Sequence, residues 1–379
     1  MTECLSRLLA PLSADSFLKH YQAREHFYVG RSCSGYYADL LTVTEIDRVL
    51  QSGQLPAAVL NVVKDGVRCP LEEWSCFVSS SRGPLQIAIP EKLLSLYADG
   101  ATLILNQAHG VLPALTDTCR MLTQELGFPT QTNIYITPHN SIGFSKHSDE
   151  HDVLILQVAG SKSWRVYPHD ASEAEFDLQA GDLLYIPRGM FHDARSRDED
   201  SIHITLGLRP TYGFELIRDL ATVAAERVNF QRPVPPRFAG ADAMELFEAD
   251  LLAGLQTLVA ELKPSTLISL RGRDLLMHQA EAWPGRFADL RVLSRMTPDT
   301  VVCRRFENPA AMKDDGKFLH FAFGDRQVTI PVFMREQLPR ILDDGNFTVG
   351  EIEGMITSSG KVKLMAEFVR AGFHRIVNI

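Results

Sequence analysis

The sequence lacks paired cysteines, long apolar runs and an excess of basic residues. Its six cysteines are scattered over 379 residues without a Cys-x-x-Cys pair. This spacing argues against a structural zinc site or a redox dithiol and for free thiols in a reducing compartment. No stretch reaches the roughly 18 apolar residues that a membrane span needs, and the first residues lack the basic start of a secretion signal. The expected location is the cytoplasm, with no membrane partner.

Net charge and chain length limit the expected binding partners and the number of packed units. There are 38 Lys and Arg against 47 Asp and Glu, which gives a net charge of -9. Such a surface repels nucleic acid and anionic lipid, so no direct nucleic-acid contact is expected. A chain of 379 residues exceeds what a single hydrophobic core usually serves, which predicts two or three packed units.

Apolar spacing predicts the local structure of the first third. Residues 1–55 carry helix-spaced apolar residues, which predicts a helical lead-in. The run 102–105 is typical of a buried strand, and a helix is expected from Pro113 to Leu126, where Gly127 ends it.

The middle of the chain is rich in short strands. Between Gln131 and Leu208, turn residues separate short apolar or alternating runs, which is the pattern of a small antiparallel barrel or sandwich. The runs are 133–137, 153–158, 164–167, 183–186 and 201–208.

After Pro210 the pattern changes to helices. Two helices are expected at 214–228 and 241–262, divided by a proline-rich breaker. From about residue 291 the chain returns to mixed structure and predicts a compact α/β module, compatible with a winged helix. The expected elements of this module are strands at 318–323 and 327–330 and helices at 335–342 and 348–356.

Two segments carry the residues with chemistry. In the first, His147-Ser148-Asp149 runs into an apolar strand, and residues i and i+2 of an extended chain share one face. The second starts at Gly181 and ends in His192 after a strand and a turn. Two histidines and one carboxylate form the facial triad of non-haem Fe(II) oxygenases, which leaves one side of the metal open. Zinc accepts the same ligands and stays an alternative.

The neighbouring polar residues have simpler interpretations. His151 and Asp152 are expected to be structural, because a strand that starts there turns one outward and leaves the other to cap the turn. In 201–208 the apolar residues alternate with Ser201, His203 and Thr205, which share the other face. That face either lines a polar pocket or meets solvent.

Several motifs together resemble the JmjC-type cupin family of ribosomal oxygenases. The resemblance covers nearly the whole chain and is most specific between Asn133 and His192. The matching segments are Asn133-Ile-Tyr-Ile-Thr-Pro, Gly143-Phe144, His147-x-Asp149-x-x-Asp152, Gly160-x-Lys162-x-Trp164-Arg165 and the segment ending at His192. The resemblance implies an α+β fold with a double-stranded β-helix core, a helical dimerisation segment and a C-terminal winged-helix-like domain. The corresponding boundaries are 1–210, 211–290 and 291–379.

The resemblance also assigns the ligands of the site. It implies Fe(II) held by the triad and 2-oxoglutarate as co-substrate, with Lys162 at its distal carboxylate. A dianion that enters a buried barrel needs such a cation. Asn133 and Thr137, which share a strand face, match polar co-substrate contacts; His203 and Thr205 join them if their face lines the pocket. Ser148 replaces the aromatic residue common in the family, which alters the surroundings of the metal.

The implied activity is a dioxygen-dependent hydroxylation of a protein side chain. The expected substrate is a β carbon of Arg or His in a ribosomal protein, and the expected assembly is a homodimer. Three alternatives stay open: hydroxylation of a natural-product precursor peptide, demethylation of a modified lysine, and a winged-helix nucleic-acid-binding protein whose cupin senses a metal. The C-terminal region mixes basic and acidic residues without a basic stripe, which ranks the last alternative below the oxygenase.

Overall fold

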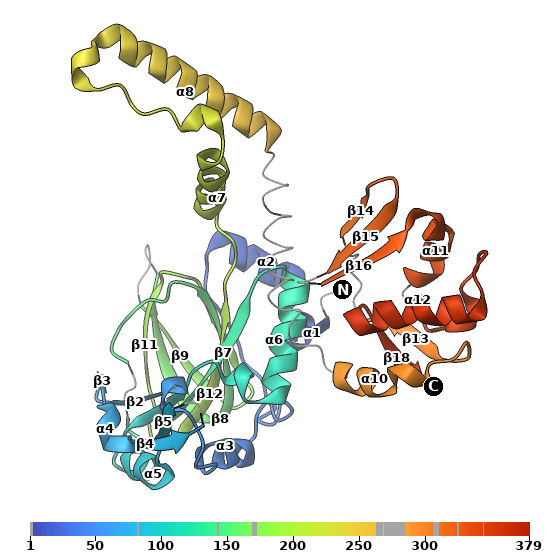
Figure 1. Ribbon diagram of the computed structural model, residues 1–379. Helices are drawn as coiled ribbons and strands as arrows, with labels where there is room; N and C mark the ends of the chain where they lie inside the picture. Colours follow the sequence, from blue (N-terminus) through green and yellow to red (C-terminus); the bar gives the residue numbers. More distant parts are fainter. Residues whose placement is uncertain are drawn as a thin grey trace. The chain divides into compact units, whose positions relative to one another are not determined.

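The computed structural model describes residues 3–81, 83–141, 144–168, 173–262, 268, 285–305, 311–323, 326–343 and 345–379, and of 311–313, 322 and 323 it describes the backbone alone. The chain divides into two compact units, residues 1–212 and 213–379 (Figure 1). Within the described residues, no helix combines the length and the apolar character that crossing a membrane requires.

The first unit is built around a large antiparallel sheet. Its helices are α1 (Glu3–Leu9), α2 (Ala14–Ala23), α3 (Val43–Leu50), α4 (Leu71–Trp74), α5 (Pro90–Ala98) and α6 (Pro113–Leu126). Its strands are β1 (Phe27–Val29), β2 (Leu60–Lys64), β3 (Val67–Arg68), β4 (Ser75–Ser80), β5 (Gly83–Ala88), β6 (Thr102–Leu105), β7 (Thr130–Thr137), β8 (Asp152–Tyr167), β9 (Ala174–Gln179), β10 (Leu183–Ile186), β11 (Phe191–Arg195) and β12 (Ser201–Leu208).

Strand β8 connects two layers of strands. Its first half pairs with β10 and β12 in the order β1-β10-β8-β12-β7-β6-β2-β3. Its second half pairs with β9 and β11 instead. The strand changes partners after Gly160, just past the shift in its pairing with β12 between Ile202 and His203. One continuous strand thereby contributes to both walls of the barrel, as a double-stranded β-helix requires.

Gly160 allows β8 to pass from one set of partners to the other. Its φ of +60° lies in the left-handed region, which side chains disfavour. A Cβ atom at this position would come within 1.8 Å of the carbonyl oxygen of Asp200. Both the backbone conformation and the close approach therefore require glycine.

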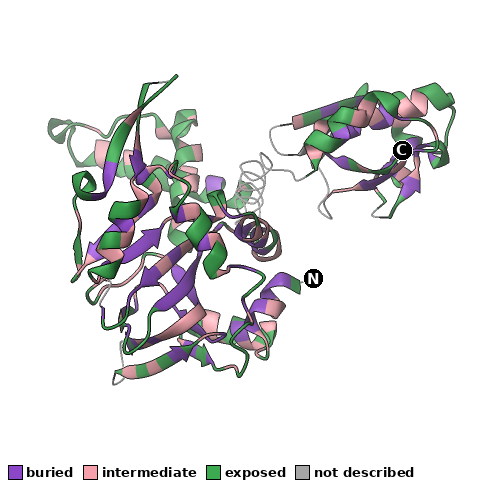
Figure 2. Ribbon diagram, turned by 90° about the horizontal axis from the view of Figure 1, so that it is seen from below, coloured by how far each residue is buried: buried purple, intermediate pink, exposed green. Residues whose placement is uncertain are grey.

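The two faces of the main sheet have different neighbours. Alternate residues such as Leu154, Ile204 and Tyr185 join the helices α1, α2, α3 and α6 in the largest apolar core. The opposite residues face the barrel interior, where Ile155, Trp164 and others form a second, smaller cluster. Because both faces are covered, β6, β10 and β12 are buried along their whole length. Figure 2 shows buried strands in the first unit in purple.

The second unit begins with two helices and ends in a small α/β module. Its helices are α7 (Gly213–Ala225), α8 (Ala241–Glu261), α10 (Arg286–Val292), α11 (Leu338–Ile341) and α12 (Ser358–Ala371). Its strands are β13 (Val301–Arg304), β14 (Ala311–Asp314), β15 (Phe318–Phe323), β16 (Arg326–Pro331), β17 (Phe347–Thr348) and β18 (His374–Asn378). The strands form two sheets, β17-β13-β18 and β14-β15-β16. Phe368 of α12 packs against Phe321 of β15 in a common apolar core.

The prediction for α6 is confirmed, with Pro113 in its first turn and Gly127 in the left-handed conformation after Leu126. The expectation that residues 1–55 are helical throughout is wrong, because β1 interrupts the helices to pair with β10.

The expected helix at 348–356 is also wrong. Residues 347–351 form a short strand and a 3-10 turn, whose Val349 is buried in the core of the module. The helix starts later, where the Thr357 side chain accepts a hydrogen bond from the Gly360 N–H. An N-cap of this kind fixes where a helix begins.

Substitution of Gly160 by Ala should destabilise the first unit by more than about 2 kcal/mol, since it adds a clash to the cost of the left-handed conformation. Gly127→Ala is a matched control, because Gly127 also has a positive φ but open space around it. It should cost only about 1 to 2 kcal/mol. Urea unfolding of the two variants measures the difference, and equal losses would contradict the role of the close approach.

Candidate metal centre

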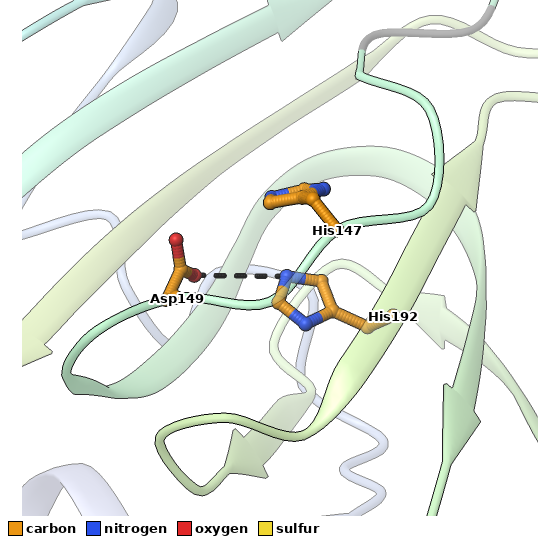
Figure 3. Close-up of side chains that lie close together, drawn as sticks. All are labelled: His147, Asp149 and His192. Atoms are coloured by element: carbon orange, nitrogen blue, oxygen red, sulfur yellow. Dashed lines mark ion pairs between the residues drawn. The ribbon is translucent and has the colours of Figure 1, made fainter.

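Three side chains from two segments of the chain meet inside the barrel. The potential ligand atoms of His147, Asp149 and His192 all lie within 4.8 Å of one another. Figure 3 shows the side chains converging, with His147 and Asp149 on one segment and His192 on the other. The Nε2 atom of His192 is 3.6 Å from Oδ2 of Asp149. The geometry brings together the residues that the sequence predicted as one ligand set.

Both imidazoles are oriented by backbone carbonyls. Nδ1 of His147 lies 2.9 Å from the Ser145 carbonyl oxygen, and Nδ1 of His192 lies 3.0 Å from that of Met190. A carbonyl only accepts, so each Nδ1 carries the proton and each Nε2 keeps its lone pair. Burial lowers the pKa of His192, which favours its neutral form. Histidines that bind a metal through one ring nitrogen typically donate a hydrogen bond from the other.

The two ligand-bearing segments are joined by backbone hydrogen bonds. The His147 N–H donates to the His192 carbonyl at 3.0 Å, and the His192 N–H donates back at 2.8 Å. The Gly189 N–H donates to the Asp149 carbonyl at 2.9 Å. These bonds fix the relative positions of the three ligands before any ion is bound.

The donor set suits a divalent transition metal. Two imidazoles and one carboxylate would supply three ligands on one side of a divalent ion and would leave its other positions open to further ligands. Fe(II) and Zn(II) both accept nitrogen and carboxylate ligands, so the three residues alone do not distinguish them.

A pocket extends from the triad into the barrel. It contains the triad and eight other residues: Tyr135, Phe144, Ile155, Lys162, Trp164, Ala194, His203 and Thr205. On the polar face of β12, His203 and Thr205 line this pocket and Ser201 is buried, so the face does not meet solvent. Apolar and aromatic side chains make up about half of this set, which is typical of a site that excludes water.

Lys162 is a buried cation in this pocket. It is 3% exposed, and its Nζ donates a hydrogen bond to Oγ1 of Thr137 at 2.9 Å. Burial lowers the pKa of Lys162 to about 7. Among the described residues, no carboxylate forms an ion pair with it. A buried ammonium without a counter-ion is costly, so the pocket is suited to bind an anion beside it.

His203 lies beside Lys162 and is surrounded by aromatic rings. Its ring stacks on that of Tyr135, with 4.8 Å between centroids and 6° between planes, and meets Trp164 edge-on at 5.4 Å. Burial and the charge of Lys162 lower the pKa of His203 well below its usual value. Its Nδ1 has no hydrogen-bond partner in the described part of the chain. A buried polar atom of this kind calls for a partner from a ligand or water.

Not all of the other residues predicted to contact the co-substrate line the pocket. Thr205 lines the pocket, and Thr137 reaches it through its bond with Lys162. Asn133 is not among the lining residues; its Oδ1 accepts a hydrogen bond from the Gln107 N–H at 3.0 Å. Gly143 of the sequence motif lies outside the described residues.

Sequence reasoning passed over Tyr135, Phe144 and Trp164 as pocket residues. Tyr135 shares one face of β7 with Asn133 and Thr137, so the period of two could have identified it. Trp164 belongs both to the inner apolar cluster and to the pocket. Phe144 precedes the strand on a loop, where no periodicity applies.

Residues 105–216 match the family model described as the JmjC domain. This segment contains strands β7 to β12 and the triad, so the JmjC domain that the sequence motifs predicted is confirmed for it.

Two curated relatives match more than half of the chain. The chain is 33% identical over 258 residues to ribosomal oxygenase 1 of Rattus norvegicus, which covers 61% of this chain and 42% of that protein. It is 32% identical over 228 residues to the bifunctional lysine-specific demethylase and histidyl-hydroxylase NO66 of Drosophila grimshawi, covering 54% and 30%. The chain therefore spans less than half the length of these relatives.

Solved structures of a shorter protein match almost the whole chain. The ribosomal oxygenase YcfD of Escherichia coli, in complex with cobalt and succinic acid, aligns with a TM-score of 0.53 over 97% of this chain and 99% of that one. Its complex with cobalt and 2-oxoglutarate aligns with a TM-score of 0.51 over the same fractions. The identity is 16% in both, so the similarity establishes the fold.

Replacement of any triad residue by Ala should weaken binding of Co(II) at least about a hundredfold, because two remaining ligands hold a divalent ion poorly. Titration of the purified chain, followed by visible absorbance, measures this affinity. Glu150→Ala is the control, since this exposed carboxylate is adjacent to Asp149 but outside the triad. Unchanged affinity in any of the three variants would remove that residue from the ligand set.

Proposed function

We propose that the chain is an Fe(II)- and 2-oxoglutarate-dependent oxygenase that hydroxylates a polypeptide side chain. The observation that carries this proposal is one pocket that holds both an oriented His147, Asp149 and His192 triad and the buried, uncompensated Lys162. A metal with open positions and a distant cation together match a ligand that chelates at one end and is anionic at the other. 2-Oxoglutarate has this chemistry.

The lysine end of the pocket supplies more than charge. The Thr137 hydroxyl accepts from Lys162, and its own proton stays available for a carboxylate oxygen. The neutral His203 ring offers a further donor. We assign Lys162, Thr137 and His203 to the distal carboxylate, and Thr205 to the wall beside it. Asn133 would act indirectly, by positioning the Tyr135 ring on which His203 stacks.

The triad would hold Fe(II), which activates dioxygen as the co-substrate is decarboxylated to succinate. The chain contributes by orienting the ligand side chains and by excluding water from the site. The carbonyls of Ser145 and Met190 keep both Nε2 atoms available to the metal. Ile155, Trp164 and Phe144 surround the site with apolar surface. A dry, ordered pocket limits oxidation that is not coupled to substrate.

The substrate class follows from the relatives. One is a ribosomal oxygenase and another a histidyl-hydroxylase, so we propose a ribosomal protein with a hydroxylated His or Arg β carbon. The net charge of -9 favours a basic polypeptide through electrostatic steering. The NO66 relative is also a lysine-specific demethylase, which keeps demethylation as the second activity to test.

A substrate screen tests this proposal. The chain is incubated with Fe(II), 2-oxoglutarate and separate pools of ribosomal proteins, short peptides and metabolites, and mass spectrometry follows oxygen addition and methyl loss. Oxygen should add to a ribosomal protein, and high salt should slow the reaction. The Asp149→Ala variant is the control for uncatalysed oxidation.

The other outcomes separate the alternatives. Oxidation of a short biosynthetic peptide but no ribosomal protein would favour the precursor-peptide hydroxylase. Oxidation confined to metabolites would refute a polypeptide substrate, and methyl loss without oxygen gain would favour the demethylase.

Substitution of Lys162 by Met should raise the KM for 2-oxoglutarate 10- to 100-fold, because a charge-assisted hydrogen bond contributes about 1.5 to 3 kcal/mol. Met keeps much of the side-chain volume, and Lys162→Arg should restore part of the affinity. Co-substrate turnover measures KM, and Lys92→Met, at an exposed lysine, is the control.

Proton uptake gives an independent measurement on Lys162. Its pKa of about 7 means that the free side chain loses its charge as pH rises above that value. A bound carboxylate favours the charged form, so co-substrate binding above about pH 7 should take up a proton in the wild-type chain. Calorimetry in buffers of different ionisation enthalpy detects this uptake. The same uptake in Lys162→Met would show that another group is responsible.

We further propose that α7 and α8 form a dimer interface, within a division of the chain into 1–210, 211–290 and 291–379. None of the described residues of α7 is buried, and of α8 only Leu258 is. Along α8, Leu252, Leu255 and Val259 form a stripe that is 57%, 40% and 54% exposed. Exposed apolar surface of this extent is typical of protein interfaces.

The double substitution of Leu252 and Val259 by Asp should convert a dimer into a monomer, because both residues lie one above the other on α8. Light scattering at micromolar concentration gives the mass. Met355→Asp, at a fully exposed apolar residue of the C-terminal module, should leave the dimer intact. A monomeric wild-type chain would contradict the interface.

The nucleic-acid alternative has less support. Arg305 pairs with Asp289 inside the C-terminal module, and Arg304 donates to the Leu342 carbonyl. These two arginines are thus engaged in internal contacts. We therefore retain the oxygenase as the proposal, with the expected cytoplasmic location as part of it.

A further inference from the structure

We infer that the ion pair between Arg24 and Asp152 positions both metal-binding segments, so that the end of helix α2 acts as a positioning element for the metal centre. The inference rests on the proposed metal site. It concerns residues that do not contact the ion themselves. Arg24 is 123 positions before His147 in the sequence, and no motif links the two.

The backbone places the Arg24 side chain. Arg24 follows α2 in the left-handed conformation, with a φ of 59°, and its N–H group caps the helix by donating to the carbonyls of His20 and Tyr21. A left-handed residue other than glycine is uncommon and is maintained by its surroundings. Here those surroundings include two hydrogen bonds from Nη1 to Asp152, at 2.8 and 3.1 Å.

Asp152 is the central acceptor of the network. Its side chain is fully buried, and it accepts hydrogen bonds from the Arg188 N–H at 2.7 Å and from the Tyr185 hydroxyl at 3.1 Å. Nη2 of Arg24 donates to the Arg188 carbonyl at 3.1 Å. Arg24 and Asp152 together therefore hold both backbone polar groups of Arg188.

Arg188 belongs to the turn that connects to the triad. The next residue, Gly189, donates its N–H to the Asp149 carbonyl, and the Met190 carbonyl accepts from the His192 ring. Asp152 itself is three residues after Asp149 at the start of β8. The network thus joins the segment that carries Asp149 to the turn that orients His192.

Loss of the guanidinium would leave a buried carboxylate without its counter-ion. Such a group either takes up a proton or admits water, and in both cases the contacts around it rearrange. The groups that move first are those bonded to Asp152, which include the turn at Arg188. Displacement there changes the relative positions of Asp149 and His192, so metal affinity should fall more than overall stability predicts.

Arg31 is a matched control in the same N-terminal segment. Its guanidinium donates to the carbonyls of Leu8, Ala10 and Gly181 and to the Tyr37 hydroxyl. It also ties the N-terminal helices to the barrel, at the opposite end of β10 from the turn at Arg188. Of these partners only Gly181 belongs to a metal-binding segment, and it lies at the far end of that segment from His192.

The test uses the full chain, stripped of metal. Co(II) affinity is measured by visible absorbance against a competing chelator, and the melting temperature is measured without metal. Arg24→Ala should weaken Co(II) binding on the order of 10- to 100-fold, as is usual when a residue that orients ligands is lost. Arg24→Lys keeps the charge with fewer donors and should lose less. Arg31→Ala should lower the melting temperature but change Co(II) affinity by less than about twofold.

The outcomes separate the inference from the proposed function. If the wild-type chain binds Co(II) and both Arg24 variants bind it equally well, the positioning role is refuted while the metal site stands. Equal weakening by Arg24→Ala and Arg31→Ala would also refute it, because the effect would then be general destabilisation. If Arg24→Ala does not fold, the Lys variant decides alone. A wild-type chain that binds no Co(II) would refute the proposed function and the positioning role with it.

Discussion

The reciprocal backbone hydrogen bonds between His147 and His192 are the interaction on which the site depends. They join a loop to a strand 45 residues later, and each bond ends at a residue whose side chain points into the pocket. Backbone bonds of this kind are independent of side-chain identity and survive substitution. The pairing of these two segments therefore fixes the relative positions of the triad residues, and the surrounding strands of the barrel hold the pairing in register.

The local parts of this arrangement could be predicted from the sequence. His147 and Asp149 are two residues apart on an extended segment, which already places both on one face. The alternation in β12 separated Ile202, Ile204 and Leu206 from His203 and Thr205, although it did not decide whether the polar face met solvent. The polar face is buried because a second layer of strands covers it. That layer forms because β8 continues past Gly160 and pairs with β9 and β11.

Long-range contacts were out of reach. The sequence suggested that Asp152 was structural, which its burial supports, but nothing in it indicated that Arg24 was the partner. The period of two places Tyr135 on the same strand face as Asn133 and Thr137, but it does not show the stacking on His203 of the neighbouring strand. Periodicity describes one strand at a time, whereas these contacts join different elements. The errors at β1 and at 348–356 have the same origin, because short segments take their structure from what they pack against.

The interior of the barrel is divided between two kinds of side chain, and this division explains how one small fold serves both stability and chemistry. Val153, Val166 and Leu184 belong to an ordinary apolar cluster. Lys162 and His203 occupy the pocket, where each costs stability by being buried with too few partners. Such a cost is tolerated only if a ligand offsets it. Burial lowers the pKa of Lys162 because the charged side chain has lost its hydration. The same low-dielectric surroundings strengthen the attraction between Lys162 and a bound carboxylate, which offsets this cost.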